Sequence, residues 1–388
     1  MPHADDRPVV VVGAGASGLA AAAVLADAGC DVLCLEARNR PGGRLLSIRA
    51  DSTRPDSTGT TQPGSTHPDG TGAGGEDALD LGATWFWDGE QRVQDLVARL
   101  GLDTFAQHTA GSAIFQDAKG THRLQGNPID GPAHRYTAGA DALTDGLAAT
   151  LPAGALRLNT PVTAIRATTG GLAVQTADTT HVAGHVVLAV PPALALARID
   201  FGDALPTDLV GLARATPVWM GAVVKVIAVY PDAFWRHDGL AGAAFSYTGP
   251  LQELHDMSGP LGHPAALFGF GTATATTTST GPAFRQAVIE QLTELFGPAA
   301  ARPSALHVHD WSTEHWTSPP DVHRLNNYSL FGHPRYRQPA LDGRLHWAST
   351  ETTDYTGHLE GALAGGQRAA RTVLSARSSP DPAPTTPR

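Results

Sequence analysis

A short glycine motif near the N-terminus, Gly13-Ala-Gly15-Ala-Ser-Gly18, constrains the fold of this chain more than any other feature. An apolar run at residues 8–12 comes directly before it, and an alanine-rich segment follows at 17–28. A second apolar run covers residues 31–36. This order predicts a βαβ unit, in which a helix connects two buried parallel strands.

The glycines and one acidic residue suit a dinucleotide. Gly13 allows the tight turn, Gly15 lets the backbone approach a pyrophosphate, and Gly18 lets the helix pack on the strand. The helix N-terminus, which includes Ser17, supplies free N–H donors and positive potential. Glu36 lies 23 residues after Gly13, where its carboxylate can accept hydrogen bonds from both ribose hydroxyls. The alternative is a glycine-rich turn beside a solvated glutamate.

The segment after Glu36 continues the binding pattern. Its paired glycines, Gly42 and Gly43, allow backbone to lie close to a ligand, and Arg44 can neutralise a diphosphate or face a flavin. The segment resembles the FAD-binding signature of the flavin amine oxidase superfamily, whereas a basic surface turn is the alternative. The resemblance implies FAD contacts at Ala37, Arg38, Gly42, Gly43 and Arg44. Because no second glycine motif of this kind follows, a separate nicotinamide domain is not expected.

The similarity to flavin monoamine oxidases extends through most of the chain. Residues 79–85 resemble the strand and turn that lays backbone against the flavin ring, and residues 161–162 and 187–192 resemble the adenine-side segment and a returning strand. Residues 346–352 and 357–363 resemble the C-terminal flavin motif. The resemblance implies further FAD contacts at Gly82, Ala83, Thr84, Trp85, Val162, Trp311, Thr350, Glu351, Gly361, Ala362 and Leu363. From the residues alone, Trp311 is interpreted as a packing residue with a polar edge.

Three residues are candidates for the chemistry. The resemblance implies that Lys225 holds a water at the reactive flavin nitrogen, and an ammonium inside an apolar strand does need a water or anion partner. An outward-facing edge lysine is the alternative. Tyr328, interpreted as a strand residue, matches one tyrosine of the aromatic cage that flanks the amine, and His358 occupies the other position. Asn327 stands where animal monoamine oxidases carry the cysteine that binds flavin, so non-covalent FAD is expected.

A predicted helix at residues 360–375 begins with glycines. The N–H groups of Gly361, Gly365 and Gly366 could stabilise negative charge on a reduced flavin. Glu351, which precedes this helix, could accept ribityl or pyrophosphate-proximal hydrogen bonds, or it could be a solvated strand-end residue.

The predicted elements give a mixed α/β fold class. An FAD-binding Rossmann-like domain with a β-meander is expected at residues 1–90, 137–217 and 327–375. A smaller mixed α+β substrate domain is expected at residues 91–136 and 218–326, so both domains are discontinuous. Segment 52–77 contains almost only Ser, Thr, Gly, Pro and Asp, which predicts a disordered insertion, and 376–388 is a predicted disordered tail.

Composition excludes several classes of partner. The net charge of −10 and pI of about 5.9 repel phosphate backbones, so no nucleic-acid partner is expected. The longest apolar run, residues 9–25, holds three glycines and is a poor membrane span. The acidic first residues do not resemble a secretory leader, so a cytoplasmic location is expected.

No metal centre is expected. Cys30 and Cys34 are placed in one strand, roughly 13 Å apart at about 3.3 Å per residue. Because a disulfide needs Cα atoms within about 7 Å, both are interpreted as reduced, buried thiols. His307 and His309 are interpreted as a surface pair without a third ligand.

The sequence therefore predicts an FAD-dependent oxidoreductase. It would oxidise a small-molecule amine to an imine, pass hydride to flavin and be reoxidised by oxygen. The sequence leaves the state of assembly open, and a homodimer is one alternative. A protoporphyrinogen-oxidase-like or desaturase-like enzyme is the runner-up, since those share nearly every FAD motif. A non-enzymatic binding protein on the same fold is the alternative from another class.

Overall fold

A computed structural model describes residues 7–50, 77–273 and 281–378. The chain forms two compact units, each built from separate segments. Unit 1 comprises Met1–Pro41, Leu147–Thr216 and Tyr328–Arg388, and unit 2 comprises Gly42–Gly146 and Pro217–Asn327. Each unit therefore joins segments that are distant in the sequence.

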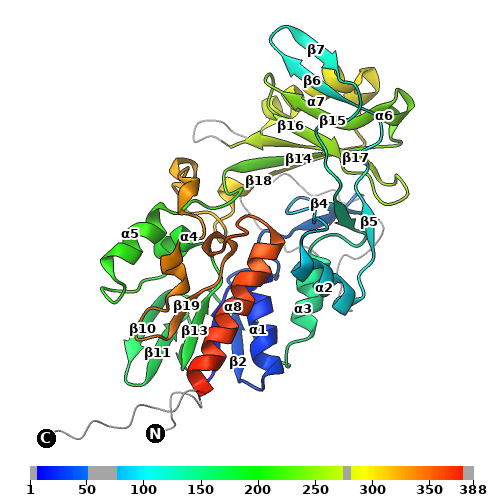
Figure 1. Ribbon diagram of the computed structural model, residues 1–388. Helices are drawn as coiled ribbons and strands as arrows, with labels where there is room; N and C mark the ends of the chain where they lie inside the picture. Colours follow the sequence, from blue (N-terminus) through cyan, green and yellow to red (C-terminus); the bar gives the residue numbers. More distant parts are fainter. Residues whose placement is uncertain (1–6, 51–76, 274–280, 379–388) are drawn as a thin grey trace, which may run out of the picture. The chain divides into compact units, whose positions relative to one another are not determined.

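Unit 1 is built on a parallel sheet. Helix α1 (Ala16–Asp27) connects its strands β1 and β2 as the predicted βαβ unit, and α8 (Leu359–Ser378) lies beside α1 (Figure 1). The sheet order is β19 (Leu345–Trp347), β13 (His185–Leu188), β1 (Val9–Val12), β2 (Val32–Leu35) and β9 (Leu156–Arg157). Strands β1 and β13 are buried along their whole length, as parallel strands covered on both faces are.

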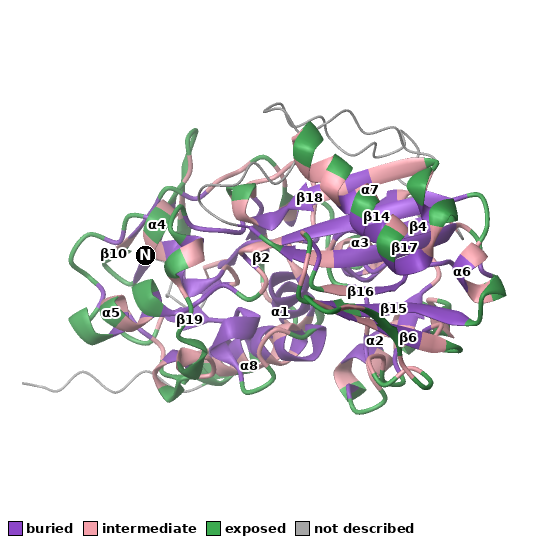
Figure 2. Ribbon diagram, turned by 90° about the horizontal axis from the view of Figure 1, so that it is seen from above, coloured by how far each residue is buried: buried purple, intermediate pink, exposed green. Residues whose placement is uncertain are grey.

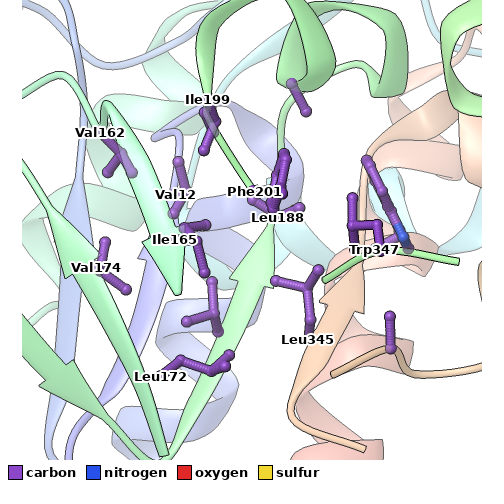
Figure 3. Close-up of a cluster of buried hydrophobic side chains, with 14 of the residues drawn as sticks. Val12, Val162, Ile165, Leu172, Val174, Leu188, Ile199, Phe201, Leu345 and Trp347 are labelled. Atoms are coloured by element: carbon purple, nitrogen blue, oxygen red, sulfur yellow. The ribbon is translucent and has the colours of Figure 1, made fainter. Parts of the chain in front are cut away.

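The predicted meander forms a second, antiparallel sheet in unit 1. Its strands are β10 (Ala164–Thr168), β11 (Gly171–Gln175) and β12 (Thr180–Ala183), and helices α4 (Pro192–Arg198) and α5 (Thr207–Ala215) follow β13. Ile165 and Val174 of this sheet share a buried core with Leu188, Leu345 and Trp347 of the parallel sheet (Figure 3). Burial of this apolar surface therefore holds the meander on the parallel sheet.

Unit 2 is built on a seven-stranded mixed sheet. Its order is β18 (Ala305–Asp310), β14 (Val223–Tyr230), β17 (Ala265–Thr272), β16 (Glu253–Asp256), β15 (Leu240–Ser246), β6 (Ser112–Asp117) and β7 (Gly120–Arg123). The neighbouring strands are antiparallel except β15 and β6. Strands β14 and β17 are largely buried (Figure 2). Helix α7 (Pro282–Phe296) packs its apolar side on one face of this sheet.

The opposite face of that sheet carries a second core. Leu79 and Leu81 pack there against Ile227 of β14 and Phe268 of β17. Two short hairpins belong to unit 2, β3 (Ser47–Arg49) with β4 (Ala78–Asp80) and β5 (Thr104–Ala106) with β8 (His134–Tyr136). Its other helices are α2 (Gln91–Leu100) and α6 (Phe234–His237), and the boundary between the units falls within α3 (Ala142–Ala149).

The compact units differ from the predicted domains in their limits. Residues 42–90 and 137–146, predicted for the FAD-binding domain, belong to unit 2. Which ligand each domain binds stays a prediction. Helix α8 continues through Ser378 because no proline follows before residue 380, so the predicted tail begins too early. The predicted insertion 52–77, apart from Asp77, and the rest of the tail lie outside the described residues.

Two predictions about cysteine and histidine are wrong in part. Cys34 is buried in β2, but Cys30 precedes the strand and is partly exposed, because Gly29 ends the helix in a turn with φ of +78°. Both thiols are free. His307 and His309 are each 8 % exposed, so they are not a surface pair. They lie on one face of β18, where they pair in register with Ile227 and Lys225.

The described residues contain neither a helix suited to cross a membrane nor a cluster suited to hold a metal ion. None of their helices combines the length and the hydropathy that crossing a bilayer requires. Nor do their His, Cys, Asp and Glu side chains form a group of three or more that could hold a metal ion.

Candidate active site

The glycine turn of unit 1 requires its glycines. Gly13 has a φ of +96°, and a Cβ there would lie 2.9 Å from Cγ1 of Val190. A Cβ on Gly18 would collide with the carbonyl oxygen of Gly13. Gly15 is the N-cap of α1 and offers no side chain as a cap. The backbone N–H groups of the first turn, which includes Ser17, are therefore the donors that an anion would meet.

Glu36 fixes the turn from the end of β2. Its side chain is buried, and its Oε2 accepts a hydrogen bond from the N–H of Ala14 at 2.8 Å. Its Oε1 accepts one from the N–H of Arg38 at 2.9 Å. The alternative of a solvated glutamate is wrong. The carboxylate holds Ala14 and the Ala37–Arg38 segment together and keeps further lone pairs for a ligand.

Close packing explains two glycines of α8. A Cβ on Gly365 would collide with the carbonyl oxygen of Ala348, and one on Gly366 with that of Ser17. The Ser17 hydroxyl itself donates to the Ala348 carbonyl. Because α8 begins at Leu359, Gly365 and Gly366 lie beyond its first turn, so the prediction that they begin the helix is wrong.

The first turn of α8 still offers one of the predicted donors. A Cβ on Gly361 would collide with the carbonyl oxygen of Tyr355. Ala362 follows and donates its N–H to the carbonyl of His358 at 3.2 Å, whereas the side chain of Leu363 is buried. Only Gly361 of the three predicted glycines therefore lies where a helix N-terminus can favour negative charge.

Thr350 and Glu351 lie in a 3₁₀ turn directly after β19. Glu351 is fully buried, so the alternative of a solvated strand-end residue is wrong. The Thr350 hydroxyl donates to the carbonyl of His358 at 3.1 Å and accepts from the N–H of Gly357 at 3.0 Å. Thr350 thereby ties the end of the parallel sheet to the start of α8.

Neither Tyr328 nor His358 lies in a β-strand. Tyr328 lies in a 3₁₀ turn and is 56 % exposed, with its ring 5.5 Å from that of Phe331. The prediction of a strand position is wrong because Gly332 and Pro334 favour turns here. His358 is exposed just before α8. Val162 is buried in the core of Figure 3, so any ligand contact there falls to its backbone.

Two predicted cofactor segments lie side by side within unit 2. Gly42 and Gly43 have φ of +108° and +60°, which place Arg44 beside the turn after β4. The N–H of Ala83 donates to the carbonyl of Arg44 at 3.1 Å. A Cβ on Gly82 would collide with that same carbonyl oxygen. This close approach explains why both segments are rich in glycine.

Two tryptophans border the Gly82 turn. Trp311 is buried, and its indole N–H donates to the carbonyl of Leu81 at 3.0 Å, which confirms a packing residue with a polar edge. Trp85 is partly exposed, and its indole N–H donates to Oε1 of Gln107 at 3.1 Å. Its ring lies 5.3 Å from that of Phe268.

Lys225 is buried on an inner strand. It is 1 % exposed on β14, between β18 and β17, so the alternative of an edge lysine is wrong. Its Nζ donates to the carbonyl of Gly82 at 3.0 Å and to Oγ1 of Thr84 at 2.5 Å. It also lies 4.3 Å from the ring centre of Phe268, a cation–π contact. Burial lowers the pKa of Lys225 to about 7.

The sequence interpretation missed two buried charges near Lys225. Asp80 accepts hydrogen bonds from the hydroxyl of Ser47 at 2.7 Å and from the N–H of Ala140 at 2.9 Å, and burial raises its pKa. Arg135 donates to the carbonyl of Ser258 at 2.8 Å. Asp80 could have been found by the argument used for Lys225, a charge inside an apolar strand. Arg135 sits in a short polar segment that gives no such signal.

Comparison with known families agrees with this arrangement. Residues 116–374, more than half of the chain, match the family described as flavin containing amine oxidoreductase. Residues 11–100 match the NAD(P)-binding Rossmann-like domain. The chain belongs to the flavin-containing amine oxidoreductase family. The predicted family and its flavoprotein class are thereby confirmed.

Curated relatives of this flavin-containing family differ in how much they share. Putrescine oxidase of Kocuria rosea is 29 % identical over 489 residues, covering 96 % of both chains. A putative flavin-containing monoamine oxidase, AofH of Mycobacterium tuberculosis, is 33 % identical over 244 residues. A probable flavin-containing monoamine oxidase A of Dictyostelium discoideum is 29 % identical over 252 residues. The match spans 52 % and 53 % of these last two relatives, about half their length.

Solved structures of amine oxidases share the fold. A putrescine oxidase bound to putrescine superposes with a TM-score of 0.77 at 22 % identity, covering 95 % of this chain and 99 % of that one. Cyclohexylamine oxidase from Brevibacterium oxydans gives 0.77 at 23 % identity, with 97 % and 99 % coverage. The predicted fold class is thereby confirmed.

Proposed function

We propose that this protein is an FAD-dependent amine oxidase. The observation that carries the proposal is Lys225, a buried ammonium bonded to the Gly82 turn that the family resemblance assigns to the flavin. Burying an ammonium is costly, so a lysine kept there is better explained by chemistry than by packing.

The residues present fit FAD. Neighbouring atoms leave no room for a Cβ at Gly13 or Gly18, and the N-terminus of α1 has no side-chain cap. These features suit a pyrophosphate, while buried Glu36 suits ribose hydroxyls. In unit 2, the backbone of Gly82 and the guanidinium of Arg44 suit the flavin end. Asn327 in place of a cysteine supports non-covalent binding, which would leave all flavin in the supernatant after acid precipitation.

FAD, when bound, supplies the acceptor for a hydride from the α-carbon of the amine. The chain's own residues bind, orient and exclude water. The Lys225 ammonium has three N–H donors; two bond Gly82 and Thr84, and the third can donate a hydrogen bond to a water molecule. Tyr328 and His358 offer exposed rings that would align a neutral amine without acting as bases. Water hydrolyses the imine product to a carbonyl compound and releases the amine nitrogen.

The substrate is proposed to be a small amine. Relatives named for putrescine and cyclohexylamine support this class. The same proposal includes oxygen as the electron acceptor, a homodimer as the state of assembly and a cytoplasmic location. Two hypotheses compete with it. One is a protoporphyrinogen-oxidase-like or desaturase-like reaction, and the other is a binding protein without flavin.

Flavin loading tests the first step of the proposal. The purified protein should be yellow, whereas Gly15→Val should be colourless and should gain no thermal stability from added FAD, because its backbone cannot approach the pyrophosphate. Gly131→Val is the matched control, since Gly131 faces open space. Full flavin content in a folded Gly15→Val protein would contradict the site.

A further inference from the structure

One face of the unit 2 sheet gathers ionisable and aromatic side chains. In register, Phe270 of β17 pairs with Lys225 of β14 and with Glu253 of β16. Two residues away, Phe268 pairs with His255 of β16. Because side chains alternate between faces with a period of two, all of these side chains lie on the face that carries Lys225.

His255 is held between two carboxylates. Its Nδ1 lies 2.5 Å from Oδ1 of Asp130, and its Nε2 lies 2.9 Å from Oε1 of Glu253. The side chains of His255 and Asp130 are each 4 % exposed, and that of Glu253 is 40 % exposed. Because ionised carboxylates only accept hydrogen bonds, both ring nitrogens must donate. This arrangement favours the imidazolium form of His255.

This cation contacts the aromatic rings next to Lys225. The ring of His255 meets the ring of Trp85 edge-on, with centres 4.9 Å apart. It stacks on Phe268 at 5.1 Å and an interplanar angle of 27°. Phe268 in turn carries the ammonium of Lys225 at 4.3 Å from its ring centre. A single chain of contacts thus runs from Asp130 through His255 and Phe268 to Lys225.

We propose that His255 is a positioning residue of the amine site that acts through Trp85. Asp130 and Glu253 fix the His255 ring, which packs against the Trp85 indole, while Gln107 holds the indole N–H. A Trp85 ring held in one orientation loses less conformational entropy when a ligand binds against it. The proposal rests on the proposed function, in which the family resemblance assigns Trp85 to the flavin, beside which the amine must bind.

The clamp predicts a dependence on pH. The charged groups that face His255 are Asp130, Glu253 and, across Phe268, Lys225. Burial acts to lower the pKa of His255, but hydrogen bonds and charges from both carboxylates outweigh it, so the pKa is raised above its ordinary value. Once neutral, the imidazole can donate through only one nitrogen, and one carboxylate contact is lost. Its contact with Trp85 then changes as the pH rises.

Tryptophan fluorescence of the holoprotein tests the clamp without any substrate. A protonated imidazole quenches an indole in contact with it, so wild-type emission should rise through a titration above the ordinary histidine pKa of about 6.5. This step should be absent from Trp85→Phe and from His255→Gln, and present in His122→Gln. His122 is the matched control because its side chain is 53 % exposed and distant in sequence. His255→Gln could fail to fold because it leaves the Asp130 carboxylate unpaired. In that case the double variant Asp130→Asn/His255→Gln, which removes that charge, takes its place.

Steady-state kinetics with benzylamine and putrescine tests the role in the amine site. We expect His255→Gln to keep its flavin, to raise KM by about 5- to 20-fold and to change kcat by less than about twofold, because only orientation is lost. A fluorescence step that persists in Trp85→Phe or His255→Gln would overturn the clamp. An unchanged KM in a folded, flavin-loaded variant would overturn the positioning role. A wild-type protein that oxidises no amine would refute the proposed function instead, while the fluorescence still decides the clamp.

Discussion

The ammonium of Lys225 donates a hydrogen bond to the carbonyl oxygen of Gly82 at 3.0 Å. This bond connects an inner strand of the unit 2 sheet to the turn that the family resemblance assigns to the flavin. A carbonyl, the Thr84 hydroxyl and two aromatic faces stabilise the ammonium there, and among the described residues it forms no salt bridge. A cation held by neutral groups can change its protonation state near neutral pH, which suits a group that handles protons.

Replacing Lys225 by Met should separate chemistry from binding. We expect Lys225→Met to retain bound FAD, yet to slow flavin reoxidation by oxygen on the order of 100-fold, since no side chain can then hold a water or a proton there. Burial lowers the pKa of Lys225 to about 7, the nearby Asp80 charge opposes this, and Arg135 adds to it. Wild-type reoxidation should therefore change with pH near 7, as the ammonium present below that pH becomes a neutral amine above it.

The Met variant should lose this dependence on pH. Stopped-flow mixing of reduced protein with oxygen from pH 6 to 9 measures both effects. Lys119→Met is the matched control, because Lys119 is the other lysine of the chain and is exposed. A Lys225→Met protein with wild-type reoxidation at every pH would refute the role.

The contact between α1 and α8 predicts a stability difference between two glycines. Gly366→Ala should destabilise the holoprotein by about 1–3 kcal/mol, because the new methyl group would collide with the carbonyl of Ser17. Gly211→Ala in α5 should instead stabilise it by up to about 1 kcal/mol, because the added methyl group meets open space. Denaturant unfolding measures both. Equal effects of the two substitutions would show that the helix packing is looser than described.

A buried histidine pair predicts the pH dependence of stability. Nε2 of His346 on β19 lies 3.2 Å from Nδ1 of His185 on β13. Burial, with the charges of His185 and Arg368, lowers the pKa of His346 to about 3. Between pH 6.5 and 3 the unfolded state binds a proton that the folded state does not. Stability is therefore lost as the pH falls through this window, by about 2 kcal/mol at pH 5.

Substituting each histidine checks this prediction. His346→Gln should lower the free energy of unfolding at pH 7 but should reduce its loss between pH 7 and pH 5. His237→Gln should leave that loss unchanged, because its side chain is 76 % exposed. A wild-type protein equally stable at both pH values would count against a neutral, buried His346.

Local signals in the sequence explain which features could be predicted. The βαβ unit could be predicted because the glycines, the two buried strands and Glu36 all lie within one short segment of the chain. Lys225 could be recognised because a charge inside an apolar strand is costly wherever it lies. The glycines of α8 were ambiguous, since a glycine suits both a helix start and a close helix contact, and Gly366 serves the contact.

Contacts between distant residues could not be predicted. Asp130 and His255 are 125 residues apart, and neither stands in a pattern that predicts burial. Arg135 reaches the carbonyl of Ser258 across 123 residues. Tyr328 is an aromatic residue between polar neighbours, and such a pattern fits both a strand and an exposed turn. Only the folded chain decides between them.

Anaerobic mixing of the yellow holoprotein with a panel of amines tests the central claim most directly. The panel should hold primary, secondary and polyamine substrates and amino acids, together with a porphyrinogen and a polyene. If the protein is an amine oxidase, at least one amine will bleach the flavin absorbance in the absence of oxygen, and admitting oxygen will restore it. If no amine bleaches the flavin while the porphyrinogen or the polyene does, amine oxidation is the wrong reaction for this site.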